Sequence, residues 1–123
     1  MAKAEKRSKE DGLPSQVALA VRAAGEKKAN DLIVLDLRAT GGFTDFFVIA
    51  SGSNERQVRA IADAVVESLK AHDVKPAHVE GYGRSEWILI DYFDFVVHVF
   101  SPETRVFYAL ERLWGNADRI EVR

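Results

Sequence analysis

The apolar residues of this chain form two patterns, a helical repeat in some segments and continuous runs typical of buried strands in others. From Val58 to Leu69 they return every three or four positions, which is the spacing of one helix face. Asn54 and Gln57, just before this stripe, predict a capping box at the start of the helix. A weaker stripe follows Ser15, which we expect to cap a first helix. The two stripes consist of Val17, Ala20, Val21 and Ala24 in the first helix and Val58, Ile61, Ala62, Val65 and Leu69 in the second.

Continuous apolar runs predict strands in the rest of the chain. Residues 31–37 and 46–50 are almost entirely apolar, as in strands that are covered on both faces. Residues 78–82 predict a shorter strand. The runs Trp87–Asp91 and Phe95–Phe100 are close enough in sequence to pair as a hairpin.

The C-terminal quarter predicts one more helix and a short edge strand at residues 120–122. Ser101 and Pro102 suit the cap and the first turn of this helix, and Gly115 is placed to end it. Its buried face would consist of Phe107, Leu110, Leu113 and Trp114, and we expect Trp114 in the core. The order of helices and strands predicts an α/β (α+β) fold, in which a single mixed β-sheet of about five strands is packed with helices.

Length and charge narrow the class of protein. A chain of 123 residues is typical of one domain, which we place at residues 13–123. Residues 1–12 are rich in charges of both signs and predict a disordered tail. A net charge of −2 argues against a protein that grips naked nucleic acid, and no apolar run reaches the ~18 residues of a membrane span.

The residues that most often carry chemistry do not form a recognisable catalytic or metal-binding pattern. The three histidines lack metal-ligand spacing, and the chain has no cysteine. Asp45 fits the first acid of a nucleotidyltransferase metal pair, but the second position is Phe47, which cannot bind a metal. We therefore expect no catalytic residue, no cofactor and no metal. Asp45 either shapes the turn after Gly41 and Gly42 or contacts a partner.

Several separated segments together resemble one known family. These are residues 45–57, 87–91, 94–100 and 105–114, and they agree with the family in order and spacing. The chain resembles the ribosomal silencing factor family, also called Iojap-like, over about residues 15–122. This resemblance implies a nucleotidyltransferase-like topology without the catalytic acids, in agreement with Phe47.

The resemblance also implies a function in translation. Members of this family bind the fourteenth protein of the large ribosomal subunit and block joining with the small subunit when nutrients are scarce. It further implies a cytoplasmic protein associated with the large subunit, a role in large-subunit biogenesis, and free chains that can form homodimers. We thus expect a non-enzymatic translation repressor without direct sequence-specific binding of nucleic acid. The alternatives are a divergent nucleotidyltransferase-like enzyme and a direct ribosomal RNA-binding module.

The family signature points to candidate partner-binding residues on and around the predicted hairpin. Its Trp-x-Leu-x-Asp element matches Trp87, Leu89 and Asp91, which share one face of a strand because side chains alternate. Trp87 either anchors an interface, the reading that the family favours, or packs beneath the last helix. The remaining candidates are Tyr92, Asp94, His98 and Arg105, and a lone His98 in an apolar strand suits packing or an interface better than metal binding.

One residue of the predicted turn departs from the family. Phe93 occupies a position where members usually have glycine, and a phenylalanine resists positive φ. We expect either a reshaped turn or a Phe93 side chain that adds an apolar contact at the rim of the interface.

Overall fold

A single six-stranded sheet organises the computed structural model, which describes residues 12–41, 44–108 and 118–121 of the chain. The predicted tail lies outside the described residues, except for Gly12, and so do Leu110, Leu113, Trp114 and Gly115 and the side chain of Phe107. The described elements are α2 (Ser15–Glu26), β1 (Asn30–Asp36), β2 (Phe46–Ser51), α3 (Glu55–Lys70), β3 (His78–Glu80), β4 (Trp87–Asp91), β5 (Phe95–Phe100), α4 (Pro102–Tyr108) and β6 (Asp118–Glu121).

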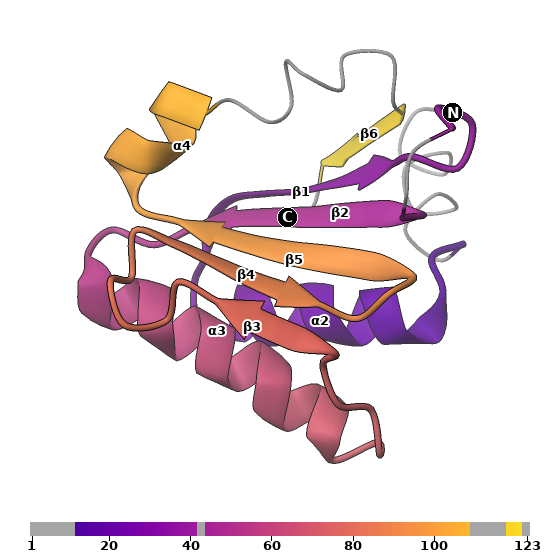
Figure 1. Cartoon of the computed structure of the whole chain (residues 1–123), viewed down its shortest axis with the longest axis horizontal. Coiled ribbons are helices and arrows are strands. Elements are labelled where there is room, and N and C mark those ends of the chain that lie inside the picture. The colour runs from indigo at the N-terminus through magenta and orange to yellow at the C-terminus, as the bar shows by residue number, and fades with distance from the viewer. Residues whose placement is uncertain (1–11, 42–43, 109–117, 122–123) are drawn as a thin grey trace.

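The sheet consists of two antiparallel groups joined by one parallel pairing (Figure 1). The strand order is β3-β4-β5-β2-β1-β6. β1 pairs antiparallel with β2 and with β6, and β4 pairs antiparallel with β3 and with β5. At the centre β2 runs parallel to β5, from Phe46 opposite Phe95 to Ser51 opposite Phe100. We call this central β2–β5 pairing the parallel seam. The predicted class, a mixed sheet packed with helices, is confirmed.

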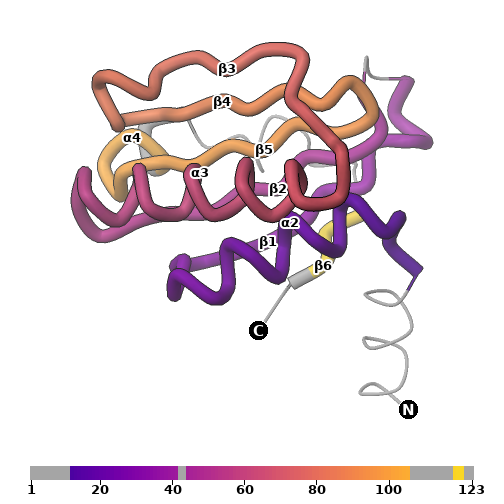
Figure 2. Tube along the Cα trace, turned by 90° about the horizontal axis from the view of Figure 1, so that it is seen from below, coloured from indigo at the N-terminus to yellow at the C-terminus, as the bar shows by residue number. Residues whose placement is uncertain are grey.

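Two long helices cover one face of the sheet, and α4 lies on the other face (Figures 1 and 2). The main core lies between the sheet and the pair α2 and α3, which contact each other along their length. The apolar stripe predicted for the longer helix is fully buried there and consists of Val58, Ile61, Ala62, Val65 and Leu69. A second buried cluster lies on the α4 side of the sheet and includes Leu35, Phe47 and Ile49.

The start of α3 follows the predicted cap closely. The Asn54 side chain accepts a hydrogen bond from the Gln57 amide at 2.8 Å. The Gln57 side-chain oxygen accepts from the Ser53 amide, one residue earlier than an ideal capping box. The Gln57 side-chain amide also donates to the carbonyls of Lys27 and Lys28, so this residue ties the start of α3 to the end of α2.

Two predicted boundaries were wrong, both because of backbone geometry. Ser15 is not the cap of the first helix: Pro14 holds that position, its carbonyl accepts the first helical bond from Ala18, and no side chain caps the helix. The strand predicted over residues 78–82 ends at Glu80. Gly81, with φ of +82°, turns the chain away from the sheet at this point.

Candidate functional site

The two faces of β4 have different surroundings, as the alternation of its side chains predicts. Ile88 and Ile90 point towards the helices and are 0% exposed. Trp87, Leu89 and Asp91 point to the opposite face and are half-buried. Through strand pairing they share this face with the side chains of neighbouring strands. We call this surface the Trp87 face; it consists of Trp87, Leu89 and Asp91 of β4, Val96, His98 and Phe100 of β5, and Phe47, Ile49 and Ser51 of β2.

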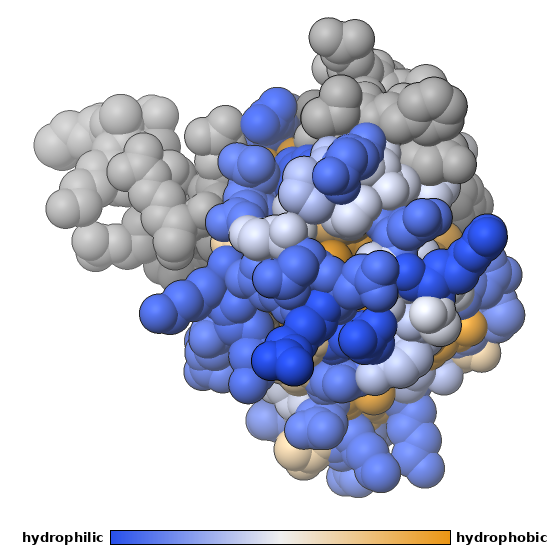
Figure 3. Space-filling view, turned by 90° about the vertical axis from the view of Figure 1, so that its left-hand side faces the viewer, coloured by the Kyte–Doolittle hydropathy of each residue, from blue (hydrophilic) through white to orange (hydrophobic). Residues whose placement is uncertain are grey.

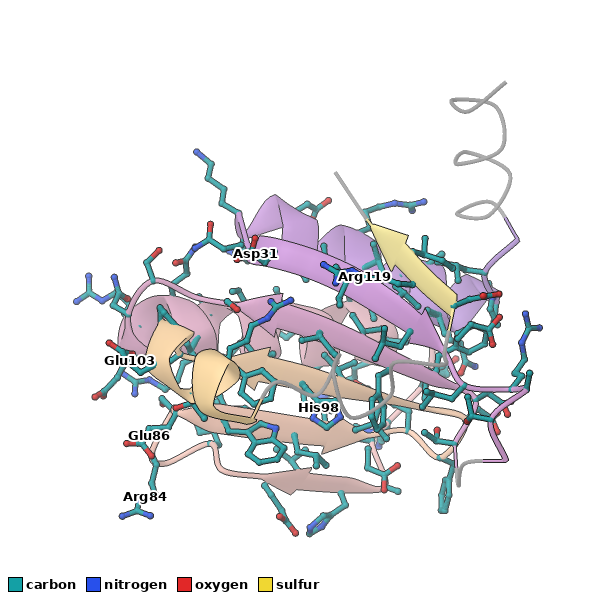
Figure 4. The ribbon with its side chains drawn as sticks, turned by 90° about the horizontal axis from the view of Figure 1, so that it is seen from above. Asp31, Arg84, Glu86, His98, Glu103 and Arg119 are labelled. Carbon is teal, nitrogen blue, oxygen red and sulfur yellow. The ribbon has the colours of Figure 1, made fainter. Side chains whose placement is uncertain are left out.

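A hydrogen bond to His98 orients the indole of Trp87. The Trp87 Nε1–H group donates to Nδ1 of His98 at 3.0 Å. The indole also lies against the ring of Phe100, with the two ring centroids 5.0 Å apart. Figure 4 looks onto this side of the sheet, with His98 near its middle and α4 over one end. An acceptor and an aromatic neighbour thus hold the indole in one orientation.

His98 is a buried neutral histidine. Its side chain is 4% exposed, and burial lowers its pKa to about 3. Because Nδ1 accepts the bond from Trp87, the ring proton is on Nε2. Within the described part of the chain, Nε2 has no hydrogen-bond partner. The ring of Phe47 meets the imidazole edge-on, with the two ring centroids 4.5 Å apart. Residue 47 is the position at which a nucleotidyltransferase metal pair would have its second carboxylate, and here its side chain packs against His98.

Arg105 connects α4 to the edge of the Trp87 face. Its guanidinium donates to the hydroxyl of Ser51 at 2.9 Å, across 54 positions of sequence. Ser51 is buried at the end of β2. Its role was missed from the sequence, where the only signal was a hydroxyl directly after an apolar strand. Arg105 and His98 therefore both lie on the Trp87 face or at its edge, and their predicted contact with a partner stays a prediction.

Hydrogen bonds from two directions fix the turn between β4 and β5. The Phe93 amide donates to a carboxylate oxygen of Asp91, and the Thr44 hydroxyl donates to the Phe93 carbonyl, each at 2.8 Å. The Asp45 amide donates to the Asp94 carbonyl at 3.0 Å. Phe93 keeps a positive φ of 71°, and its side chain is 76% exposed. The positive φ is thus kept with phenylalanine in place of glycine, and the expected contact of Phe93 at the rim of an interface stays a prediction.

Tyr92 lies on the other side of the sheet from Trp87. It is 6% exposed and stacks on Phe95, with the ring centroids 4.8 Å apart. Burial raises the pKa of its hydroxyl to about 12. The structure therefore does not bring Tyr92 to the surface that carries Trp87, Leu89 and Asp91.

The loop that leads into Trp87 is attached to α3. We call residues 81–86 the entry loop. Ser85 in this loop is 0% exposed and has a φ of +59°. Its hydroxyl accepts from Arg59 of α3 at 2.9 Å and donates to the Tyr82 carbonyl at 3.0 Å. The Tyr82 hydroxyl donates to Asp63 of α3 at 3.1 Å. The two contacts with α3 join residues 26 and 19 positions apart in sequence, and sequence reasoning missed them.

Both ends of the sheet carry polar side chains. The end that carries α4 and the start of α3 presents mostly hydrophilic residues (Figure 3). The opposite end, where β4 and β1 finish, carries carboxylates. The Arg38 side chain pairs with Asp36 there at 2.7 Å, and their hydrogen bond lowers the pKa of the Asp36 carboxyl. The carboxylates at this end belong to Asp36, Asp45, Asp91, Asp94 and Asp118.

The described residues contain neither a metal-ligand cluster nor a membrane-spanning helix. No three histidine, aspartate or glutamate side chains in the described ranges are grouped closely enough to hold a metal ion. Among the helices described, none has the length and apolar character needed to cross a bilayer.

Comparison with known proteins gives consistent matches over most of the chain. A family model described as "Ribosomal silencing factor during starvation" matches residues 10–123. The ribosomal silencing factor RsfS of Halalkalibacterium halodurans is 39% identical over 104 residues, which is 85% of this chain and 89% of that protein. A Mus musculus protein named "Mitochondrial assembly of ribosomal large subunit protein 1" is 30% identical over 84% of this chain, which spans 46% of that longer protein.

A solved structure is similar to this chain in both fold and sequence. A crystal structure of a Chromobacterium violaceum protein is similar with a TM-score of 0.80 and 37% identity, over 82% of this chain and 84% of that one. The signature residues, the mixed sheet and these matches lead to the same conclusion: this chain belongs to the ribosomal silencing factor family.

Proposed function

We propose that this chain represses translation by binding the fourteenth protein of the large ribosomal subunit and sterically blocking the small subunit. Family membership supports a function on the ribosome, and the name of the Mus musculus relative supports the large subunit as the target. The observation that carries the proposal is the half-buried row of Trp87, Leu89 and Asp91 on the sheet face opposite the two long helices. A tryptophan with a fixed orientation beside polar groups is the type of residue that most often anchors an interface.

The proposed mechanism depends on steric obstruction by the bound chain and involves no chemical reaction. A specific interface takes roughly 800 Å² from each partner. The accessible surface of this chain is 7413 Å², so such an interface covers about a tenth of it and leaves the rest to obstruct an incoming subunit. The neutral His98 and the Ser51–Arg105 contact hold the binding surface in place before the partner arrives. Preorganisation of this kind lowers the entropy lost on binding.

We also propose a role in assembly of the large subunit, self-association of the free chain and a location in the cytoplasm. A chain that stays on the large subunit acts in the cytoplasm beside ribosomes and also protects immature large subunits from premature joining. In the absence of ribosomes, we propose that two chains form a homodimer through the half-buried row of Trp87, Leu89 and Asp91, because the remaining apolar area of this row is stabilised by burial. Sedimentation of the free chain at increasing concentration tests the homodimer.

Substitution of Trp87 by alanine tests the proposed interface. We expect the affinity for the isolated fourteenth protein of the large subunit to fall about 30-fold, which corresponds to about 2 kcal/mol for a buried tryptophan anchor. Calorimetric titration measures the affinity, and light scattering of mixed subunits measures joining. Saturating wild-type protein should prevent joining, whereas the same amount of Trp87→Ala should not.

A matched control separates loss of the interface from loss of the fold. Val79→Ala removes an apolar side chain that is 40% exposed on the neighbouring strand β3 and pairs with Ile90, so it lies on the helix side of the sheet. This variant should bind like wild type. Equal binding by Trp87→Ala and wild type would remove Trp87 from the interface. If wild type instead bound only bare ribosomal RNA, with steep dependence on salt, the protein partner would be wrong.

A further inference from the structure

Phe93 combines two features that both oppose folding. It is the most exposed large apolar side chain of the described residues, at 76%, against 43% for Tyr82 and 40% for Val79. It also has a φ of +71°, in the left-handed region that bulky side chains avoid. Glycine would suit this backbone better and would expose no ring. Strained residues that persist in a fold are frequently functional, and here the strain coincides with an exposed aromatic ring.

The surrounding structure imposes this conformation on Phe93. The Asp91 carboxylate holds its amide, and the Thr44 hydroxyl, from the segment that enters β2, holds its carbonyl. The next residue is also held, because the Asp94 carbonyl accepts from the Asp45 amide. Hydrogen bonds therefore hold the backbone on both sides of Phe93, and its ring is exposed at the surface.

Phe93 lies in the turn at one end of the Trp87 face. β4 begins at Trp87 and ends at Asp91, so the row Trp87, Leu89, Asp91 leads directly to the turn. Asp91 belongs to both, since its side chain lies on the Trp87 face and accepts from the Phe93 amide. The row starts at Trp87, near the side of the molecule that carries α4 and that is mostly hydrophilic (Figure 3).

Three aspartates lie in or next to the turn that carries Phe93. Asp94 follows Phe93 directly in the sequence and is exposed. Asp45, which precedes the first residue of β2, is also exposed. Asp91 is half-buried beneath the turn. An apolar ring among negative side chains matches a recess that is apolar inside and has lysine or arginine at its margin.

We propose that Phe93 is an anchor residue that inserts into an apolar recess with a basic margin on the large-subunit protein bound by the Trp87 face. This inference rests on the proposed function and names a second point of contact at the far end of the same surface. The fixed backbone places the ring in the bound conformation in advance, so no loop has to be ordered on binding. The carboxylates of Asp45 and Asp94 contact the basic margin.

The substitution Phe93→Gly separates the role of the ring from the stability of the turn. Glycine relieves the positive φ and removes the exposed ring, so the midpoint of thermal unfolding should stay the same or rise. The affinity for the isolated fourteenth protein should nevertheless fall at least about tenfold. Phe93→Leu keeps an apolar side chain and the strain, and it should retain part of the affinity. A residue that only shaped the turn would give no loss of affinity in a stable glycine variant.

The controls distinguish failure of this proposal from failure of the proposed function. Val79→Ala, on the helix side of the sheet, should bind like wild type. If Phe93→Gly binds like wild type while Trp87→Ala is weakened, the anchor is wrong and the proposed interface stands. If wild type itself does not bind the ribosomal protein, the proposed function is wrong. If Phe93→Gly loses only self-association, the occupant is a second copy of the chain, which also overturns the proposal.

Discussion

The contact between Trp87 and His98 makes the orientation of an indole depend on the protonation of its neighbour. Nδ1 of His98 can accept from the indole only while the ring is neutral. Protonation would turn the acceptor into a second donor, directed at the indole N–H group. Burial lowers the pKa of His98 to about 3 and thereby keeps the acceptor available through the physiological range.

His98 should therefore make stability depend on pH in the acid range. An unfolded histidine binds a proton below about pH 6.5, whereas folded His98 does so only near pH 3. Between these values the unfolded state binds more protons, so the free energy of unfolding falls as pH falls, by up to about 1.4 kcal/mol per pH unit. His98→Asn keeps a side-chain acceptor but does not titrate, and its free energy of unfolding should fall less steeply. Urea denaturation from pH 7 to about pH 4 measures both slopes.

A residue without a titratable side chain serves as the control for this prediction. Val79 pairs with Ile90 on the neighbouring strand, and Val79→Ala should keep the wild-type slope. Parallel pH curves for wild type and His98→Asn would show that His98 is not the residue responsible.

At the scale of elements, the entry loop determines where β4 begins and therefore where Trp87 lies. Gly81 turns the chain between β3 and this loop with a φ of +82°. A Cβ atom at Gly81 would overlap with the Trp87 carbonyl oxygen, so the two backbones approach too closely for any side chain. The loop is then attached to α3 through Ser85 and Arg59. The position of Trp87 thus depends on contacts made on the helix side of the sheet.

Gly81→Ala should destabilise the protein and displace Trp87. We expect a loss of about 2 to 4 kcal/mol in the free energy of unfolding, because the substitution adds both a clash and a strained φ. Gly83→Ala is the matched control in the same loop, since a Cβ atom there meets nothing within 4 Å. Urea denaturation of the two variants measures the difference. Equal stability of the two would contradict the close approach of Gly81 to Trp87.

Elements with a regular pattern could be predicted from the sequence, whereas their ends could not. The stripe from Val58 to Leu69 and the runs Trp87–Asp91 and Phe95–Phe100 have the predicted bounds or burial, because periodicity reflects which face is covered. The start of α2 and the end of β3 depend on the backbones of Pro14 and Gly81, which the pattern does not record.

The candidate site was predictable only where it follows a single strand. Alternation placed Trp87, Leu89 and Asp91 on one face, and continued by one residue it puts Tyr92 with Ile90 on the helix side, where the structure has it. Ser51 and Ser85 could not be identified in this way. Their partners, Arg105 and Arg59, are 54 and 26 positions away in sequence, and only the folded chain brings them together.

For the whole molecule, steric repression predicts a fixed ratio of chain to ribosome. A chain that obstructs a surface acts only while it is bound, whereas an enzyme acts on many ribosomes in turn. Inhibition of subunit joining should therefore rise in proportion to added chain and level off at one chain per large subunit. Light scattering of purified subunits, titrated at concentrations well above the dissociation constant, measures this ratio. Complete inhibition at a small fraction of one chain per subunit would favour the enzyme alternative.

The parallel seam has a consequence for how the chain is made. β2 pairs with β5, so residues 52–94 must be synthesised before the inner edge of β2 can find its partner. At ordinary translation speeds of about 5–20 residues per second, this takes roughly two to nine seconds. During that time an apolar strand with free backbone groups is available for mispairing with other nascent chains. The nascent chain is thus most prone to aggregate about halfway through its own translation. Translation is also the process that its family silences.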